Sequence, residues 1–302
     1  MTPDQVAARL FAPPDPVVVE RPADWLAAHR AATAAVEDGV LRALAGGTAA
    51  DRPAWAFVSG YCEALRRLVP AVGDRAVALA ATETGGVHPR AIATRLADGK
   101  LDGVKRFVTL AGVCDAALVI ASEGEAAGRN RLAAVLIPLD RAGVSLESLP
   151  PTAFAPEVPH AAVTFRGVAA LAGERQPGDG YADYLKPFRT VEDIHVMAAI
   201  TGWLAAVFAR TGPAGAAHVE ELAVLAASLV ALGRLDPRAP ATHRALGGAL
   251  AGLDQALVRA EPLWAEVDAG SRERWVRDRP LLRVAGAARV ERLARARAAG
   301  IE

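Results

Sequence analysis

Residue types that commonly carry catalysis are sparse in this chain, and their spacing argues against several chemistries. The six His residues never occur at metal-ligand spacing, so the sequence predicts no metal site. No Gly-x-Ser-x-Gly segment marks a hydrolase nucleophile, and no Gly-x-x-x-x-Gly-Lys-Ser/Thr loop marks a phosphate site. No Gly-x-Gly-x-x-Gly follows a predicted strand. Hydrolase, P-loop and Rossmann-type dinucleotide chemistry are therefore not expected.

One short stretch combines basic and apolar positions. Residues 99–112 read GKLDGVKRFVTLAG, two strand-like runs around a Gly turn that end in an aromatic-Val-Thr step. The stretch predicts a β-hairpin that is basic on one side and apolar on the other. Phe107 and Thr109 are ordinary strand residues, so a purely structural hairpin is one interpretation.

The composition is typical of a globular protein with a sizeable core. Hydrophobic residues make up 52% of the 302 residues and charged residues 23%, which disfavours disorder. The 34 basic and 34 acidic residues cancel, so no nucleic-acid partner is expected. Near the C-terminus, Arg residues alternate with Leu, Val and Ala at helical spacing, which we interpret as a solvated helix face.

Three features predict a cytoplasmic location. Cys62 and Cys114 lie far apart and in no metal-ligand spacing, as expected of thiols in a reducing compartment. The N-terminus has no basic region followed by an apolar run, so no signal peptide is expected. The most apolar windows are too short and too interrupted to predict a membrane span.

The spacing of apolar residues divides the chain into three parts. Residues 1–78 have helical spacing. Residues 79–176 change to a period near two, with β-branched residues and Gly, Asn and Pro punctuation, which predicts an antiparallel sheet or small barrel. Residues 177–302 return to the helical period and predict a four-helix bundle with a break at Pro280. The predicted fold class is α+β, with an N-terminal helical domain, a central antiparallel β-barrel-like domain and a C-terminal bundle.

Several strings resemble the acyl-CoA dehydrogenase family of flavoproteins in order and spacing. They are ATETGG at 81–86, the stretch 98–121 that contains the hairpin, LAAVLIPLDRAGVSLE at 132–147, and VTFRGVAA at 163–170. The resemblance covers roughly residues 50 to 210. It identifies the chain as a short, divergent member and implies FAD as the cofactor.

The resemblance implies a role for three residues of the β domain. Phe107 occupies the position that the family places beside the flavin ring, and Thr109 would bring a hydroxyl and a backbone N–H to the polar edge of the ring. Thr82 would do the same from the first string. A flavin needs an apolar face to stack on and a few hydrogen-bond donors that tune its electron affinity.

The sequence also departs from the family. Thr84 replaces the usual Pro, and Val87 and His88 stand where the family has a Ser that helps to hold the thioester and the flavin phosphates. The two segments that serve the adenosine half of FAD are not evident. The alternatives left open are weak FAD binding, a different flavin, or no flavin.

Glu192 is the candidate catalytic base. Removing the α-proton of an acyl thioester needs a carboxylate, and a minority of the family carries it on the long helix after the β domain, ten residues before a Gly. Glu192 lies ten residues before Gly202, with Asp193 directly after it and His195 one turn further on. A solvated Glu–Asp pair near a helix start is the alternative interpretation.

The resemblance implies a flavin-dependent α,β-dehydrogenation of acyl-CoA or a related thioester, in fatty acid metabolism. The electrons would pass to an electron-transfer flavoprotein or to oxygen, and the chain would form a homo-oligomer. The alternative is a catalytically degenerate relative that acts as a binding protein, or as the partner of a full-length dehydrogenase in a heteromer. A third possibility is a regulator that binds CoA thioesters without flavin.

Overall fold

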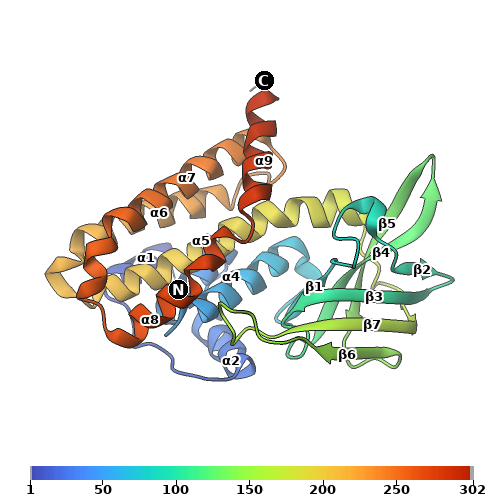
Figure 1. The fold of residues 1–302 in the computed structure, drawn as a ribbon, viewed down its shortest axis with the longest axis horizontal. Helices are drawn as coiled ribbons and strands as arrows, with labels where there is room; N and C mark the ends of the chain where they lie inside the picture. Colours follow the sequence, from blue (N-terminus) through green and yellow to red (C-terminus); the bar gives the residue numbers. More distant parts are fainter. Residues whose placement is uncertain (1, 300–302) are drawn as a thin grey trace. The chain divides into compact units, whose positions relative to one another are not determined.

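The structure is a computed structural model that describes residues 2–299. Its ribbon is shown in Figure 1. The chain forms two compact units. The helical unit contains Met1–Arg67, Ala153–Pro156 and Thr190–Glu302, and the sheet unit contains Leu68–Thr152 and Glu157–Arg189. The three-part division at residues 78 and 176 stays a prediction.

Several α-helices of the described residues begin at a Pro in their first turn or at a capping residue. Their bounds are α1 (Pro3–Phe11), α2 (Pro22–Thr33), α3 (Gly39–Ala49), α4 (Pro53–Leu68), α5 (Lys186–Ala209), α6 (Ala216–Leu232), α7 (Pro240–Arg259), α8 (Ala269–Asp278) and α9 (Gly286–Ala298). Pro occupies the first turn of α1, α2 and α7, where its missing N–H costs nothing. Asp38 caps α3 by accepting hydrogen bonds from the backbone N–H groups of Val40 and Leu41.

Close helix contacts at glycines set the core of the helical unit. A Cβ on Gly47 of α3 would lie 1.9 Å from the carbonyl oxygen of Ala199 of α5, and one on Gly60 of α4 would lie 2.4 Å from Cα of Val196. Gly202 of α5 approaches α3 in the same way. Backbones that approach this closely leave no room for a side chain, so these glycines fix how α3, α4 and α5 pack.

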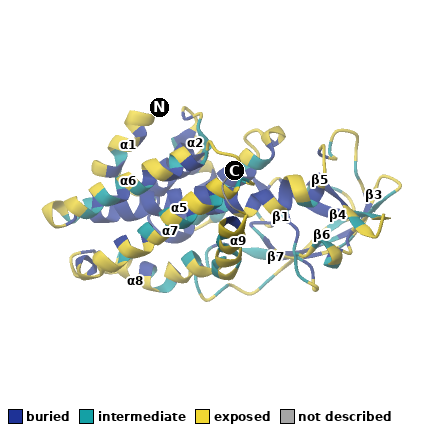
Figure 2. Cartoon of the chain, turned by 90° about the horizontal axis from the view of Figure 1, so that it is seen from above, coloured by how far each residue is buried: buried dark blue, intermediate teal, exposed yellow. Residues whose placement is uncertain are grey.

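The helix α5 is the most buried of the long helices. The stretch Gly180–Ala209 is long and apolar enough to cross a membrane, with a mean hydropathy of 1.4, but 94% of its most apolar window is buried within the protein. Figure 2 shows the buried residues as dark blue along this helix. Such burial is that of a core helix, and α5 begins after one π-helical stretch, η3 (Gly180–Leu185).

The sheet unit is built on one seven-stranded sheet. The strands are β1 (Val77–Ala80), β2 (Arg95–Ala97), β3 (Lys100–Thr109), β4 (Ala116–Ala126), β5 (Arg129–Pro138), β6 (Val144–Ser148) and β7 (His160–Ala169). They follow the order β1-β4-β2-β3-β7-β6, with β5 paired to β4. An apolar core lines one side of this sheet and includes Leu118, Ile120 and Leu136.

The mixed α+β class is confirmed, but two details of the predicted β domain differ. The sheet is not purely antiparallel, because β1 pairs with β4 in parallel and β2 makes a parallel contact with β4. The long connection that carries β2 and β3 returns the chain to the same end of the sheet, which makes parallel pairing possible. The sheet is also open: within residues 2–299, β5 pairs only with β4 and β6 only with β7, so a barrel is not confirmed.

The Gly turn predicted inside residues 99–112 is wrong, because β3 runs unbroken through Gly103 and the hairpin turn lies earlier, between β2 and β3. Ala97 pairs with Lys100, and the two turn residues Asp98 and Gly99 both have positive φ, at 52° and 69°. Two such residues form the turn whose twist matches that of the flanking strands, and an Asp-Gly pair is a favoured sequence for it. The local sequence therefore determines where β3 begins.

The C-terminal region is helical, as predicted. Pro280 lies in the short 3-10 helix η6 (Arg279–Arg283), so the predicted break is confirmed. Because this break is complete, the fourth predicted helix is two helices, α8 and α9, and the described residues after 177 contain five α-helices where four were expected.

The close contact at Gly47 predicts that two Gly→Ala substitutions change the stability of the protein by very different amounts. Gly47→Ala should destabilise the protein by about 3 kcal/mol, because α3 and α5 must separate to admit the methyl group. Gly248→Ala is the matched control, since nothing lies within 4 Å of its Cβ position on α7, and it should stabilise by about 0.5–1 kcal/mol.

Urea unfolding followed by tryptophan fluorescence measures this difference. All five Trp residues lie in the helical unit. Equal unfolding midpoints for Gly47→Ala and the native chain would contradict the close contact.

Candidate functional site

A bulge in β3 turns one aromatic side chain out of the sheet. The pairing of β3 with β7 shifts register between Lys105 and Val108, which leaves Arg106 and Phe107 in the bulge. Phe107 has φ of 52°, in the left-handed region that a bulky residue rarely occupies, and 61% of it is exposed. Bulges commonly re-aim a side chain in this way. The aromatic ring predicted to face a ligand is therefore presented at the surface of the sheet unit.

A buried ion pair lies beside the bulge. Lys105 is fully buried, and its Nζ donates to Glu83 Oε1 at 2.6 Å and to the carbonyl oxygen of Ile120 at 2.6 Å. A longer contact of 3.4 Å reaches the carbonyl oxygen of Ala81. An ammonium has three donors, so every proton of Lys105 has an acceptor. The ion pair links the segment before Thr84 to β3 and β4.

Burial and ion pairing have opposite effects on the pKa values of Lys105 and Glu83. Burial lowers the pKa of Lys105 to about 8, against the effect of the Glu83 carboxylate. Burial alone would raise the pKa of Glu83, but the Lys105 ammonium and the backbone N–H groups of Ala93 and Thr94 hold it below its ordinary value. The carboxylate accepts these two N–H groups at 2.8 and 3.0 Å. Below pH 8 the pair is ionic.

The first predicted string and the hairpin meet at this pair. The carbonyl oxygen of Thr82 accepts a hydrogen bond from the backbone N–H of Arg106 at 2.8 Å, directly before Phe107. Glu83 and Gly86 close a tight turn through two backbone hydrogen bonds, at 3.1 and 2.9 Å. The structure thus brings Thr82 next to the bulge that carries Phe107.

Thr109 lies two residues beyond Phe107 at the end of β3. It pairs with His160 of β7 and is half-buried. Thr82 is also half-buried. Thr82, Phe107 and Thr109 therefore belong to one part of the sheet unit, and we call them the Phe107 surface.

The positions that depart from the family have local structural contacts in this chain. Val87 packs against the apolar core of the sheet unit. The Nδ1 atom of His88 accepts a hydrogen bond from the backbone N–H of Arg90 at 3.3 Å and so caps the short 3-10 helix η2 (Pro89–Ala91). These side chains replace a phosphate-binding Ser with a packing residue and a helix cap.

Glu192 lies on α5 in the helical unit and is half-buried. Its neighbour Asp193 is 3% exposed and is bound by two guanidiniums of α9: Arg289 donates to Oδ1 at 2.6 Å and Arg292 to Oδ2 at 2.6 Å. The alternative interpretation, a solvated Glu–Asp pair, therefore does not describe Asp193. The segment of α5 that carries Glu192 is held by ion pairs.

His195 is buried among other charges. Its Nδ1 donates to the carbonyl oxygen of Val191 at 2.7 Å, and the charges that act on it come from Glu63, Asp38 and Arg67. Burial lowers the pKa of His195, so the ring is neutral at physiological pH. The ring lies against Gly39 of α3, and a pair with Glu192, three residues earlier, stays a prediction.

The sequence analysis quoted Glu83 and Lys105 inside its strings but assigned neither a role. The alternation of side chains along β3 could have revealed this pair. Lys105 lies four residues after the apolar Leu101, so both side chains point to the same, buried face of the sheet. Lys is rarely buried without a partner, and a Glu in the neighbouring string supplies one. Separately, no group of three or more His, Cys, Asp or Glu side chains able to hold a metal lies in the described part of the chain.

Comparison with known sequences points to one family. Residues 78–168 match the acyl-CoA dehydrogenase middle domain. The resemblance to the acyl-CoA dehydrogenase family predicted from the sequence is confirmed. The matched residues include the Phe107 surface and all seven strands except the first residue of β1 and the last of β7. No curated protein matches the chain significantly.

Solved structures extend the likeness to the whole chain at low identity. A glutaryl-CoA dehydrogenase from Mycobacterium smegmatis in complex with FADH2 is 13% identical, with a TM-score of 0.69 over 100% of this chain and 96% of that one. The prolyl acyl carrier protein oxidase AnaB is 12% identical, with a TM-score of 0.70 over 97% and 96%. FMN-bound TdsC from Paenibacillus sp. A11-2 is 16% identical, with a TM-score of 0.68 over 96% and 92%. At these identities the likeness shows the fold.

The buried pair predicts a pH-dependent penalty for Glu83→Gln. At pH 6 the variant should lose about 3–5 kcal/mol of stability, because a buried ammonium keeps no counter-charge. Glu83 raises the pKa of Lys105, so in the variant Lys105 releases its proton below about 8, and the penalty should shrink as pH rises toward that value. A Lys whose pKa is lowered in the folded state destabilises the fold when charged, so deprotonation relieves the cost.

Glu174→Gln serves as the control. Its partner Arg141 stays charged throughout the range, and both side chains are 18% exposed, so the penalty should be smaller and independent of pH. Urea unfolding followed by far-UV circular dichroism at pH 6, 7.5 and 9.5 measures both. A Glu83→Gln penalty that stays constant from pH 6 to 9.5 would show that Lys105 is not the source.

Proposed function

We propose that this chain is a flavin-dependent oxidoreductase of the acyl-CoA dehydrogenase type that removes the α-proton and β-hydride of an acyl thioester. The observation that carries the proposal is the Phe107 surface. An exposed aromatic ring in a strained backbone conformation lies beside two Thr residues and next to a fully satisfied buried ion pair. Strain of this kind commonly accompanies a functional site.

The Phe107 surface fits the chemical needs of a flavin ring. Phe107 offers an apolar face. Thr82, which bonds to the backbone beside it, and Thr109, two residues further along β3, offer hydroxyls. When bound, a flavin supplies a two-electron acceptor that takes a hydride. The task of the chain's own residues is to hold the ring flat, and the Lys105–Glu83 pair limits movement of the bulge that carries Phe107.

FAD is the cofactor that the family resemblance implies, and it is the one we propose. Val87 and His88, which pack and cap locally, offer no replacement for the missing phosphate-binding Ser. FMN is the alternative, because it lacks the adenosine half, and the TdsC structure contains FMN. In either case the ring contacts would supply a large share of the affinity.

Glu192 is our proposed base for the α-proton. It is a half-buried carboxylate on a core helix, and its neighbour Asp193 is clamped by Arg289 and Arg292, so the backbone at this position is held rigidly. General-base catalysis needs such positioning first and a matched pKa second. The substrate class extends from acyl-CoA to related thioesters, in keeping with the acyl carrier protein oxidase among the similar folds.

A degenerate binding or partner subunit is the second candidate. The observation that favours it is the replacement of the phosphate-binding position by Val87 and His88. In that case the chain would act in a heteromer with a full-length dehydrogenase. In the enzyme case it would form a homo-oligomer in the cytoplasm and pass electrons to an electron-transfer flavoprotein or to oxygen. Flavin binding separates the two candidates.

Flavin binding should depend on Phe107. The fluorescence of FAD should be quenched when it is titrated into the protein. Phe107→Ala should weaken FAD binding roughly tenfold, in line with about 1–1.5 kcal/mol for an aromatic contact. Phe11→Ala is the matched control, because Phe11 on α1 is similarly exposed, at 54%, and should leave the affinity unchanged. If neither FAD nor FMN binds the native protein, the degenerate-subunit candidate replaces the enzyme.

Glu192→Gln should separate chemistry from cofactor binding. The variant should keep its flavin content and lose dehydrogenation of acyl thioesters by about 100-fold or more, since the amide cannot accept the α-proton. Glu220→Gln, an exposed change on α6, should leave the rate unchanged. The rate of flavin bleaching by an acyl thioester under anaerobic conditions measures this. Full activity in Glu192→Gln would remove Glu192 from the role.

A further inference from the structure

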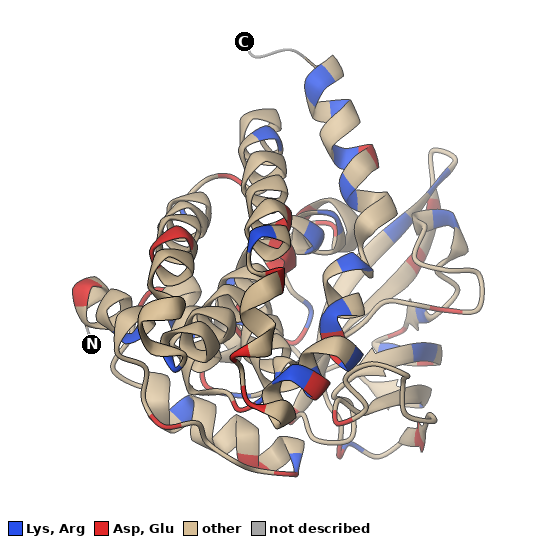
Figure 3. Cartoon of the chain, turned by 60° about the vertical axis from the view of Figure 1, so that its left-hand side comes forward, with Lys and Arg blue, Asp and Glu red and all other residues tan. Residues whose placement is uncertain are grey.

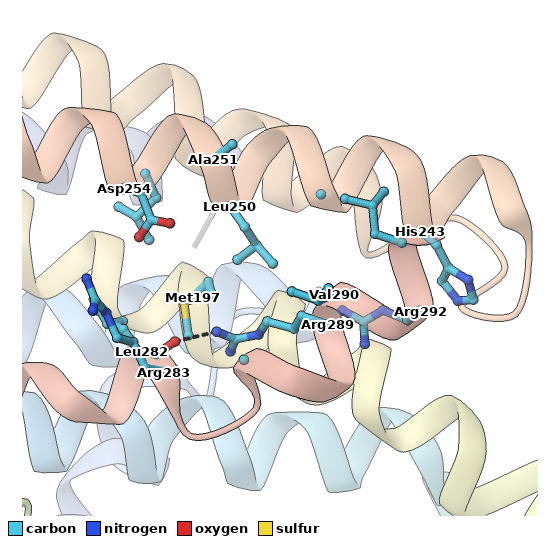
Figure 4. Close-up of a pocket in the computed structure, with 14 residues that line it drawn as sticks. Met197, His243, Leu250, Ala251, Asp254, Leu282, Arg283, Arg289, Val290 and Arg292 are labelled. Carbon is cyan, nitrogen blue, oxygen red and sulfur yellow. Dashed lines mark hydrogen bonds between the residues drawn. The ribbon is translucent and has the colours of Figure 1, made fainter. Parts of the chain in front are cut away.

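The helical unit contains an apolar cavity between α7 and α9. Its volume is about 320 Å³. Figure 4 shows Leu250 directed from α7 into the space above Met197 of α5 and Val290 of α9. Leu253, Leu282 and Leu293 complete the apolar walls. A cavity lined in this way accepts a hydrocarbon body.

Three guanidiniums border this cavity. They belong to Arg283, Arg289 and Arg292, and two carboxylates, Asp193 and Asp254, oppose them. Arg289 and Arg292 share the single carboxylate of Asp193, and Arg289 also donates to the carbonyl oxygen of Leu282. Figure 3 shows basic residues, all of them Arg, on the helix α9 that leads to the C-terminus. The border therefore carries one positive charge in excess.

Arg283 is the cation without a charged partner. It is exposed, and none of the hydrogen bonds or ion pairs found in residues 2–299 involves its guanidinium. A neighbouring cavity of about 520 Å³, lined in part by Trp275, shares Asp254, Leu282 and Arg283 with the first. Arg283 therefore lies between the apolar cavity and a second cavity of mixed lining, which also contains Glu261 and Arg279, and an anionic head on Arg283 could place its body in the apolar one.

The volume limits the size of the ligand. A space of 320 Å³ holds about ten non-hydrogen atoms, if each takes the ~30 Å³ of a liquid water molecule. Octanoate, with eight carbons and two oxygens, matches that size. An octyl phosphate presents the same chemistry with a larger head.

We propose that this cavity is a second binding site, for a medium-chain amphiphilic anion. Its anionic head group would bind Arg283, and its hydrocarbon chain would pack against Leu250. The charge excess of the border and the apolar walls carry the proposal together. It does not depend on the proposed function, because neither Arg283 nor Leu250 belongs to the Phe107 surface.

Calorimetric titration of the full chain with octanoate, octyl phosphate and the uncharged octanol tests the site. Octanoate should bind with a Kd on the order of 0.1–1 mM. Octanol should bind at least fivefold more weakly, and octyl phosphate distinguishes a carboxylate preference from a general preference for anions. Arg283→Gln should weaken octanoate binding about tenfold. Arg283→Lys should restore part of it, and Leu250→Gln should weaken both octanoate and octanol.

Arg297→Gln is the matched control, an exposed Arg on α9 outside the cavity lining, and it should bind octanoate like the native chain. Equal octanoate affinity in Arg283→Gln and Arg297→Gln would overturn the proposal, as would the absence of binding up to 10 mM. A second copy of the chain is the other occupant of an apolar groove. Sedimentation that shows a dimer dissociated by Leu250→Gln, with no octanoate bound, would assign the groove to that interface and overturn the proposal.

Discussion

The sheet unit depends on one interaction, the ion pair between Lys105 and Glu83. Burying two charges costs several kcal/mol per ion, and the cost is recovered only when every donor and acceptor is satisfied. Here the ammonium reaches Glu83 and the carbonyl of Ile120 at 2.6 Å, and the carboxylate accepts two backbone N–H groups. Any slip of β3 by one residue would point Lys105 to the other side of the sheet and leave Glu83 unpaired. The pair therefore specifies the register of the strand, and with it the bulge that carries Phe107.

The helical unit combines buried ion pairs, such as that between Arg42 and Glu63, with close contacts between helix backbones. Gly47 and Gly202 let the backbones of α3 and α5 approach closely, so α5 is fixed along one side by contacts that no side chain can adjust. Further toward its N-terminus, Asp193 is held by two guanidiniums of α9. Glu192 therefore lies on a helix segment with a fixed backbone, which is the setting in which a single carboxylate keeps one orientation.

Local signals in the sequence predicted local structure. The Asp98–Gly99 turn and the break at Pro280 are each determined by the conformational limits of one or two residues. The break was predicted, whereas the turn was expected inside residues 99–112. The parallel pairing of β1 with β4 was not predictable in the same way, because it joins residues 77–80 to 116–119 across a connection whose path no local pattern specifies. The partners of Asp193 lie 96 and 99 residues further along the chain, so spacing could not reveal them either. The order of the family strings did carry long-range information, and it is the reason that the β domain was predicted while its openness was not.

The positions at which this chain differs from the family lie on the phosphate side of the proposed cofactor site, not on the ring side. Thr82, Phe107 and Thr109, which we propose lie beside the ring, have residue types that a ring needs, and a buried ion pair lies next to the strained bulge that carries Phe107. Val87 and His88, at the phosphate position, now pack and cap within the chain itself. Maintaining φ of 52° at a Phe costs about 1–2 kcal/mol, a cost that a hairpin without a ligand would avoid by relaxing or by accepting Gly. The strain at Phe107 therefore supports the proposal that a flat ligand binds there.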